Sequence, residues 1–179
     1  MQLSVYVFKF QRHPLNKMQI NLEAFNLELR QKSLLSEEER KVLLRLWNNE
    51  YPKIISHTSL HSFDCYLEGL ENVYHYLLMD MYHDVIKGWA FTFERDNLRW
   101  FAIILSSTIQ KKGIGRIMLK YLISKEKHLS AWVIDNDRYV KSNGQPYISP
   151  LSFYTKLGCK ISKKDTSTSG ELSVIKIDF

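Results

Sequence analysis

Residues 98–125 constrain the fold more than any other part of the chain. They open with residues 100–105, an almost wholly apolar run typical of a strand that is covered on both faces. They close with residues 113–125, where apolar side chains recur at the spacing of one helix face, namely at Ile114, Ile117, Met118, Tyr121 and Leu122. A short basic loop with two glycines joins the two segments. This order of buried strand, loop and amphipathic helix predicts a domain in which helices cover a sheet.

The flanking segments supply the other strands and helices. Ser36 is followed by three glutamates up to Glu39, a capping-box pattern that begins a helix, and Pro52 ends that helix. A second, shorter helix is expected over residues 62–70, and a third follows Ser149-Pro150 and stops at Gly158. Aromatic, β-branched or alternating apolar residues predict strands at 25–29, 73–81, 85–95, 98–109, 129–134, 160–162 and 171–179. Together these elements predict an α/β or α+β fold with a mixed sheet.

The length and composition indicate one ordinary soluble domain. With 179 residues the chain suffices for a single domain, which we place at residues 18–179. Residues 1–17 fit this pattern poorly and are expected to form an edge strand or a loose extension. No apolar run reaches the roughly 20 residues that span a bilayer, and the first ten residues lack the features of a secretion signal. The 2 cysteines are too few for a disulfide framework, so we expect a cytoplasmic protein with no membrane partner.

The charge of the chain favours an anionic ligand over a nucleic acid. There are 25 Lys and Arg against 19 Asp and Glu, which gives a net charge of +6. A charge of this size is also common in small domains for solubility. The basic residues are spread along the chain, and no run of five or six like charges forms the arm that binds nucleic acids. We therefore expect no nucleic-acid partner.

The loop between the buried strand and the amphipathic helix is the best candidate for a binding site. Its residues are Gln110, Lys111, Lys112, Gly113, Ile114, Gly115 and Arg116. Glycines let the backbone turn tightly near a ligand, and the first N–H groups of a helix lack intrahelical partners. Three cationic side chains add positive charge, so a diphosphate suits the site. A dinucleotide fingerprint would need a third glycine, and a Walker A loop would need Gly-Lys-Ser/Thr, and neither is present.

The loop resembles the acyl-CoA loop of the GNAT superfamily of N-acetyltransferases, whose signature is Gln/Arg-x-x-Gly-x-Gly/Ala. A second segment, residues 152–159, is similar to the family's Phe-Tyr-x-Lys-x-Gly-Phe motif, with Cys159 where Phe is usual. The order of the expected elements also matches, and the resemblance covers about residues 25–179. It implies a GNAT-like, mostly antiparallel sheet of six to seven strands flanked by about four helices. It also implies an N-acetyltransferase that uses acetyl-CoA as cosubstrate and needs no metal.

The resemblance assigns roles to individual residues. Pantetheine would lie along the fourth strand and bond to main-chain groups of Ile103, Leu105 and Ser107, one of which would also polarise the thioester carbonyl. Tyr154 takes the place of the general acid that protonates the departing thiolate. The residues that would hold the diphosphate are those of the loop, Gln110, Lys111, Lys112, Gly113, Ile114, Gly115 and Arg116.

The chain departs from the family pattern at two places. Tyr147 stands where many relatives have an Asn that contacts the cofactor, and Arg99 and Trp100 stand where some have a catalytic Glu. The base that deprotonates the amine is therefore open, and a water chain is one alternative. The other candidates for this base are the side chains of His75, Asp80, His83 and Glu94. The missing residues also leave open a catalytically silent domain of the same fold that binds acyl-CoA.

The acceptor and the partners are less constrained by the sequence. A small-molecule or peptide amine is expected, with specificity in the loops at 53–72 and 136–148. Tyr139, Tyr147 and Trp132 would form an aromatic wall there, unless Trp132 packs in the core. A homodimer through the C-terminal strands or the N-terminal extension stays open.

The spacing of two histidines and a cysteine suggests metal binding, but the expected helix does not support it. His57, His61 and Cys65 are spaced by four and would align on one helix face. The helix is expected to begin only near Ser62, and no fourth ligand is spaced nearby. We therefore expect no metal site.

Overall fold

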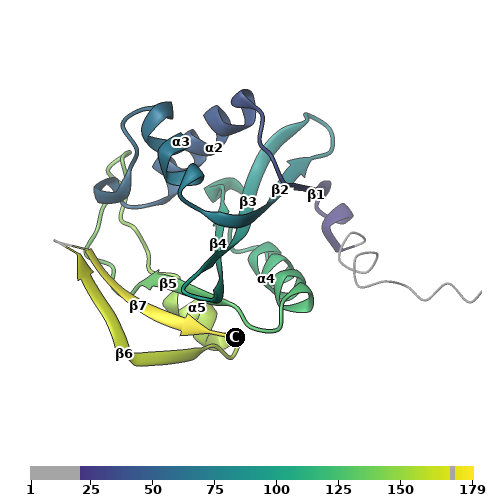
Figure 1. Ribbon diagram of the computed structural model, residues 1–179. Coiled ribbons are helices and arrows are strands. Elements are labelled where there is room, and N and C mark those ends of the chain that lie inside the picture. Colours follow the sequence, from purple (N-terminus) through teal and green to yellow (C-terminus); the bar gives the residue numbers. More distant parts are fainter. Residues whose placement is uncertain (1–20, 170–171) are drawn as a thin grey trace, which may run out of the picture.

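The computed structural model describes residues 21–169 and 172–179, without the side chains of residues 163–169, and is dominated by one sheet (Figure 1). The sheet has seven strands in the order β1-β2-β3-β4-β5-β7-β6. All neighbouring strands are antiparallel except β4 and β5, which are parallel. The strands are β1 Leu27–Lys32, β2 Glu71–Asp80, β3 Val85–Arg95, β4 Leu98–Leu105, β5 Ser130–Ile134, β6 Lys160–Ser169 and β7 Leu172–Asp178. The mixed, mostly antiparallel sheet is confirmed, whereas the extension at residues 1–17 lies outside the described residues.

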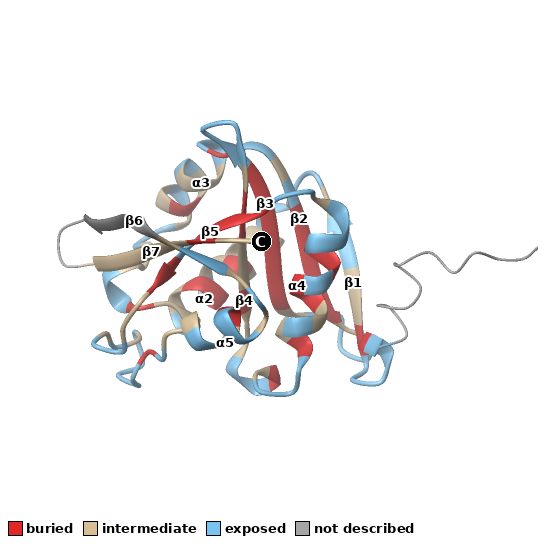
Figure 2. Ribbon diagram, turned by 90° about the horizontal axis from the view of Figure 1, so that it is seen from below, coloured by how far each residue is buried: buried red, intermediate tan, exposed pale blue. Residues whose placement is uncertain are grey.

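Helices cover both faces of the sheet. Helices α2 (Glu37–Glu50) and α3 (Leu60–Glu68) pack on one face, and α4 (Ile114–Lys125) and α5 (Leu151–Lys156) pack on the other. Two short 3-10 helices, η1 (Lys53–Ile55) and η2 (Ser107–Ile109), lie in the connections. Figure 2 shows long buried stretches in β2 and β3, in the middle of the sheet. No helix in the described part of the chain has the length and apolarity of a membrane span.

Local capping explains where the helices of the first face begin. The Ser36 hydroxyl accepts the Glu39 N–H at 3.2 Å, and the Glu39 carboxylate accepts the Ser36 N–H at 2.7 Å, as the sequence predicts. Helix α3 begins at Leu60, two residues before the expected start. Ser59 and Ser62 cap it reciprocally, with the Ser59 hydroxyl accepting the Ser62 N–H at 3.1 Å. The third helical position holds Ser62, whereas the common capping-box pattern has Glu or Gln there. The sequence therefore did not indicate this helix start.

Strands β1, β4 and β6 differ most from the sequence prediction. Strand β6 continues to Ser169, where the sequence predicted a strand only over 160–162, because residues 166–169 pair with β7. Strand β1 starts at Leu27 because Asn26 adopts a left-handed backbone conformation with a φ of 56°, which leaves Phe25 outside the strand. Strand β4 ends at Leu105 and not near residue 109. The chain turns there into η2, where the Ser106 hydroxyl accepts the Thr108 N–H at 3.4 Å. The early end of β4 brings the glycine loop next to the end of the strand.

Strands β4 and β5 separate after a single point of contact. They pair only at Trp100 and Ser130, at the start of both strands. Beyond this point β5 pairs with β7 over its whole length, from Ser130 to Ile134, and β4 pairs with β3 alone. The edge of β4 that faces β5 is therefore without a strand partner from Ala102 onward.

A buried histidine in the sheet makes the stability of the fold depend on pH. The His75 side chain is 4% exposed, and its Nδ1 accepts the Trp89 indole N–H at 3.3 Å. Burial lowers its pKa to about 4, because an imidazolium is costly away from water. The unfolded chain takes up this proton near pH 6.5 and the folded chain only near pH 4, so stability falls as the pH drops through that window.

We expect urea unfolding to show a loss between pH 7.5 and pH 5 that is about 2 kcal/mol larger in wild type than in His75→Gln. A smaller loss remains in the variant, because burial also lowers the pKa of His57. Replacing the exposed His128 by Gln provides the matched control and is expected to leave the loss unchanged. An equal pH dependence in wild type and His75→Gln would contradict the role of His75.

Candidate functional site

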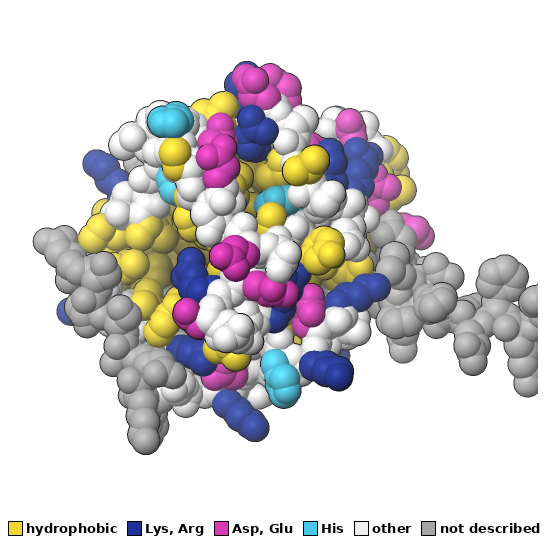
Figure 3. All heavy atoms as spheres, in the orientation of Figure 1, with side chains coloured by type: hydrophobic (Ala, Val, Ile, Leu, Met, Phe, Trp, Pro, Cys, Tyr) yellow, Lys and Arg dark blue, Asp and Glu magenta, His cyan; other side chains and the backbone are white. Residues whose placement is uncertain are grey.

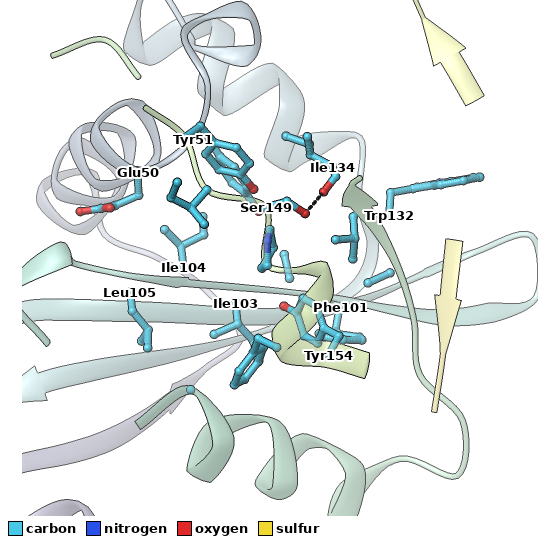
Figure 4. A pocket seen from close by; sticks show the side chains of 18 of the residues that line it. Glu50, Tyr51, Phe101, Ile103, Ile104, Leu105, Trp132, Ile134, Ser149 and Tyr154 are labelled. Atoms are coloured by element: carbon cyan, nitrogen blue, oxygen red, sulfur yellow. Dashed lines mark hydrogen bonds between the residues drawn. The ribbon is translucent and has the colours of Figure 1, made fainter. Parts of the chain in front are cut away.

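A cavity of about 990 Å³ opens where β4 and β5 separate, and it passes through the sheet. Residues 100–105 all line it: Phe101, Ile103 and Leu105 face α4 and α5, and the even-numbered ones face α2 and α3. In Figure 4, Tyr51 approaches the cavity from the end of α2 and Tyr154 approaches it from α5, on either side of β4. Its volume lies at the upper end of the range of small-molecule sites, roughly 300–1,000 Å³. It therefore suits a long ligand that enters from one face and a second molecule that enters from the other.

The backbone of β4 is oriented toward this cavity at the predicted positions. The Ser106 N–H donates to the Lys87 carbonyl of the β3 side at 2.8 Å. Because main-chain groups alternate along an antiparallel strand, those of Ile103 and Leu105 point away from β3, to the side that β5 leaves open. The Leu105 carbonyl accepts the Gln110 side-chain N–H at 2.8 Å. The N–H groups of both residues thus face the cavity.

The loop before α4 presents a group of free N–H donors. Lys111 and Gly113 adopt left-handed conformations with φ values of 60° and 83°. The first N–H of α4 that bonds backward is that of Ile117, to the Gly113 carbonyl at 3.2 Å, and no side chain caps the helix. No acceptor among the described residues takes the N–H groups of residues 114–116. Such a concave set of donors at a helix N-terminus attracts anions.

The predicted loop residues do not all reach the cavity. Lys111, Gly113 and Arg116 line it, as do Gln110 and Gly115. In contrast, the Lys112 ammonium donates to the Thr108 carbonyl at 3.1 Å, and the Ile114 side chain is buried in the core with 1% exposure. Lys112 and Ile114 are therefore placed to contribute main-chain groups at most.

Glu50, which the sequence analysis missed, organises the loops around the cavity. It ends α2, and its carboxylate accepts the Ser107 N–H at 2.7 Å, the Gln110 side-chain N–H at 3.0 Å and the Lys141 ammonium at 2.7 Å. The Ser107 N–H, which the family resemblance offers to pantetheine, is thus already bonded within the protein. Ser107 also lies outside the cavity lining.

Removing the Glu50 carboxylate is expected to destabilise the fold. The Glu50 and Lys141 side chains are 9% and 12% exposed, so Glu50→Ala leaves a nearly buried ammonium unpaired. Breaking a buried ion pair in this way costs about 3–5 kcal/mol. The control is Glu37→Ala, which removes an exposed pair with Lys41 and costs at most about 0.5 kcal/mol. Urea unfolding measures both, and an equal effect of the two substitutions would contradict the structural role of Glu50.

Tyr154 lines the cavity from α5. Its side chain is 6% exposed and packs edge-on against Phe101, with ring centroids 5.9 Å apart. Burial raises the pKa of its hydroxyl well above the usual 10, so the group stays protonated at neutral pH. None of the hydrogen bonds made by the described residues involves this hydroxyl. It is thus available to a ligand.

Two more tyrosines of the cavity lie close to Tyr154. Burial raises the pKa values of Tyr51 and Tyr147, and mutual repulsion of the phenolate forms adds to the effect at both. Tyr147 is the residue that replaces the family's Asn. The sequence did not indicate Tyr51 as a site residue, because it directly follows an amphipathic helix with no motif of its own. Burial also raises the pKa of Tyr66, which lines the same cavity, to about 12, so the described lining holds four protonated phenol groups.

Comparison with solved structures identifies the architecture. A protein from Desulfovibrio desulfuricans that is assigned to the GNAT family of acetyltransferases superposes with a TM-score of 0.62 over 86% of this chain and 98% of its own, at 12% identity. An aminoglycoside 6'-acetyltransferase of type Ii gives 0.62 at 15% identity, over 85% and 96%. The chain has the GNAT fold. An aminoglycoside 6'-N-acetyltransferase complexed with coenzyme A gives 0.59 at 14% identity, over 85% and 96%. The sequence itself matches no family model and no curated protein.

On this GNAT fold, none of the side chains considered as the catalytic base lines the cavity. His75 is in the core, and Asp80 accepts the N–H groups of Tyr82 and His83 in the turn after β2. Glu94 accepts the Asn72 side-chain N–H at 2.6 Å. Of the alternatives, only a water chain is compatible with these positions.

His57, His61 and Cys65, whose spacing in the sequence suggests a metal site, do not come together in the structure. Cys65 Sγ lies 3.8 Å from His61 Nε2 on α3. His57 packs instead against the Trp47 ring, with centroids 5.3 Å apart. Within residues 21–169 and 172–179 no three His, Cys, Asp or Glu side chains gather as a metal site.

Proposed function

We propose that this protein is an acyl-CoA-dependent N-acyltransferase that moves an acetyl group from acetyl-CoA to a primary amine by direct attack. One observation carries the proposal: a single cavity connects the unpaired edge of β4 with the free N–H groups before α4. Coenzyme A is a long ligand with amides along its pantetheine arm and a diphosphate at its other end. The two features of the cavity match these two parts in order.

The residues present fit this cosubstrate. The pantetheine amides would pair with the main chain of Ile103 and Leu105, as an added strand does. The diphosphate would lie on the N–H groups of residues 114–116, with Lys111 and Arg116 beside it. A Cβ at Gly115 would meet Phe153 at 3.3 Å and Leu105 at 3.6 Å, so the absence of a side chain there keeps the passage between helix and strand open.

Direct transfer requires one nucleophile, one acid and one proton acceptor. The amine nitrogen attacks the thioester carbonyl carbon, and the carbon–sulfur bond then breaks. The Tyr154 hydroxyl donates its proton to the departing sulfur, and a proton lost by the nitrogen restores the hydroxyl. The products are an amide and a free thiol. The burial of Tyr154 supports this role because it keeps the hydroxyl protonated.

The amine must arrive in its neutral form, and this sets the pH dependence. Glu50 is the only carboxylate among the described residues that line the cavity, it is paired with Lys141, and no histidine lines it. We therefore expect kcat/KM for an alkylamine to rise about tenfold per pH unit from pH 6 to pH 9, toward the amine pKa near 10.4. Initial rates of thiol release measure this. A plateau above pH 7 would contradict it and indicate a base in the protein.

Acetyl transfer itself is tested by calorimetric binding of coenzyme A and by thiol release from acetyl-CoA over a panel of primary amines. Binding together with amine-dependent thiol release supports the proposal. Binding without transfer to any amine would favour the catalytically silent alternative. No binding of coenzyme A would overturn both.

A further inference from the structure

The part of the cavity on the α2–α3 side of the sheet is lined by aromatic rings. If acetyl-CoA occupies the α4–α5 side, as the proposed function requires, this part receives the acceptor. Its rings are those of Trp47, Tyr51, Tyr66, Phe93, Trp100 and Trp132. Figure 3 shows hydrophobic side chains gathered on the left of the molecule, between the helices of this face and the C-terminal strands. The acceptor therefore meets flat apolar surfaces.

The rings are in contact with one another, and they range from the buried Trp47, Phe93 and Trp100 to the exposed Trp132. The Trp47 ring lies 4.6 Å from Tyr51 and 5.1 Å from Tyr66 between centroids. Trp100 and Trp132 stack 5.7 Å apart at an interplanar angle of 23°. Trp132 is 39% exposed, so it does not pack in the core, and Tyr139 of the expected aromatic wall lies outside the cavity lining. The acceptor therefore meets two groups of rings, one around Trp47 and the other formed by Trp100 and Trp132.

The charges on this side leave one cation unbalanced. Glu50 and Lys141 neutralise each other at 2.7 Å. The third charged residue, Arg95, holds its guanidinium over the Phe93 ring at 5.3 Å from the centroid. None of the described carboxylates forms an ion pair with it. Its charge reaches the cavity, because it opposes the rise of the Tyr66 pKa that burial causes.

We propose that the acceptor is a primary amine on an aromatic body that carries an anionic group, such as a carboxylate, at the end remote from the amine. The rings bind the body and Arg95 binds the anion. An acceptor with several ammonium groups finds no free carboxylate among the described residues that line the cavity, because Glu50 is paired with Lys141. The inference rests on the proposed function and adds the substrate class to it.

With the thioester carbonyl placed beside Ile103, the register of the sheet gives the distance between the amine and the anion. The Arg95 guanidinium lies over Phe93, whose partner in β4 is Trp100. Trp100 is three residues from Ile103, or about 10 Å along the strand. An amine and a carboxylate on one carbon atom are too close to bridge this distance, whereas a ring and a short linker between them span it.

The test compares three acceptors in the thiol-release assay: 4-(2-aminoethyl)benzoate, 2-phenylethylamine, which lacks only the carboxylate, and spermidine. We expect kcat/KM to be highest for the benzoate, at least about tenfold above 2-phenylethylamine, and lowest for spermidine. Arg95→Gln is expected to raise the KM of the benzoate by about tenfold and to change that of 2-phenylethylamine less than twofold. Arg95→Lys is expected to retain part of the preference, and Arg45→Gln, on the exposed side of α2, is the control.

Preference for spermidine, or an equal effect of Arg95→Gln on both aryl amines, would overturn the inference. So would acetylation of other amines with no turnover of either aryl amine, a result that leaves the proposed function intact. Absence of coenzyme A binding in the same preparation would overturn the proposed function and with it this inference. Melting temperatures of the variants verify that each remains folded.

Discussion

Tyr154→Phe is expected to lower kcat for acetyl transfer by about 10²–10⁴-fold, the usual contribution of a positioned general acid. The substitution removes a hydroxyl that bonds to no described residue and keeps the ring contacts with Phe101 and Phe179. Stability and coenzyme A binding should therefore change little. Stopped-time assays of thiol release at saturating acetyl-CoA measure the effect.

Tyr121→Phe is the matched control for this experiment. Tyr121 is also buried, on α4, but it faces Tyr76 and lies outside the cavity lining. We expect its loss to leave kcat within twofold of wild type. If Tyr154→Phe keeps most of its activity, the acid is another group, and Tyr51 and Tyr147 are the next hydroxyls to replace.

Gly115→Leu is expected to raise the dissociation constant of coenzyme A by at least about 100-fold, which corresponds to about 2.7 kcal/mol. A Cβ at this position already meets the Phe153 ring at 3.3 Å and the Leu105 side chain at 3.6 Å. A longer side chain has to occupy the passage along β4 or displace Phe153. In both cases the space between the diphosphate site and the strand is lost. Calorimetric titration measures the change.

Gly69→Ala provides the control for the glycine substitution. Gly69 ends α3, away from the cavity, and an added Cβ there makes only ordinary contacts at 3.5 Å and beyond. Coenzyme A affinity should be unchanged. Unaltered affinity in a folded Gly115→Leu variant would show that the ligand does not pass between α4 and β4.

The sequence predicted the parts of the site that local patterns determine. The apolar run of β4, the glycine loop and the period of α4 are all encoded within residues 98–125. In the structure, Ile103, Leu105 and the loop before α4 border one cavity, and their role in binding stays a prediction. The orientation of the β4 main chain also follows once its register with β3 is known.

The parts that the sequence did not predict depend on contacts between distant segments. Glu50 meets Ser107 and Lys141, which are 57 and 91 residues away along the chain. No local sequence pattern marks Glu50 as a site residue. The sequence therefore could not predict that the Ser107 N–H donates to Glu50 and is not free for a ligand. Arg95 at the end of β3 and Trp132 on β5 likewise acquire their proposed role only because the fold brings both to the lining of one cavity.

A crystal structure with coenzyme A tests the central claim most directly. We expect the diphosphate within hydrogen-bond distance of the main-chain N–H groups of residues 114–116. We also expect a pantetheine amide to bond to the main chain of Ile103 or Leu105, with the sulfur beside the Tyr154 hydroxyl. A complex in which coenzyme A binds elsewhere, with the opening between β4 and β5 empty, would contradict the assignment of this cavity to an acyl-CoA ligand.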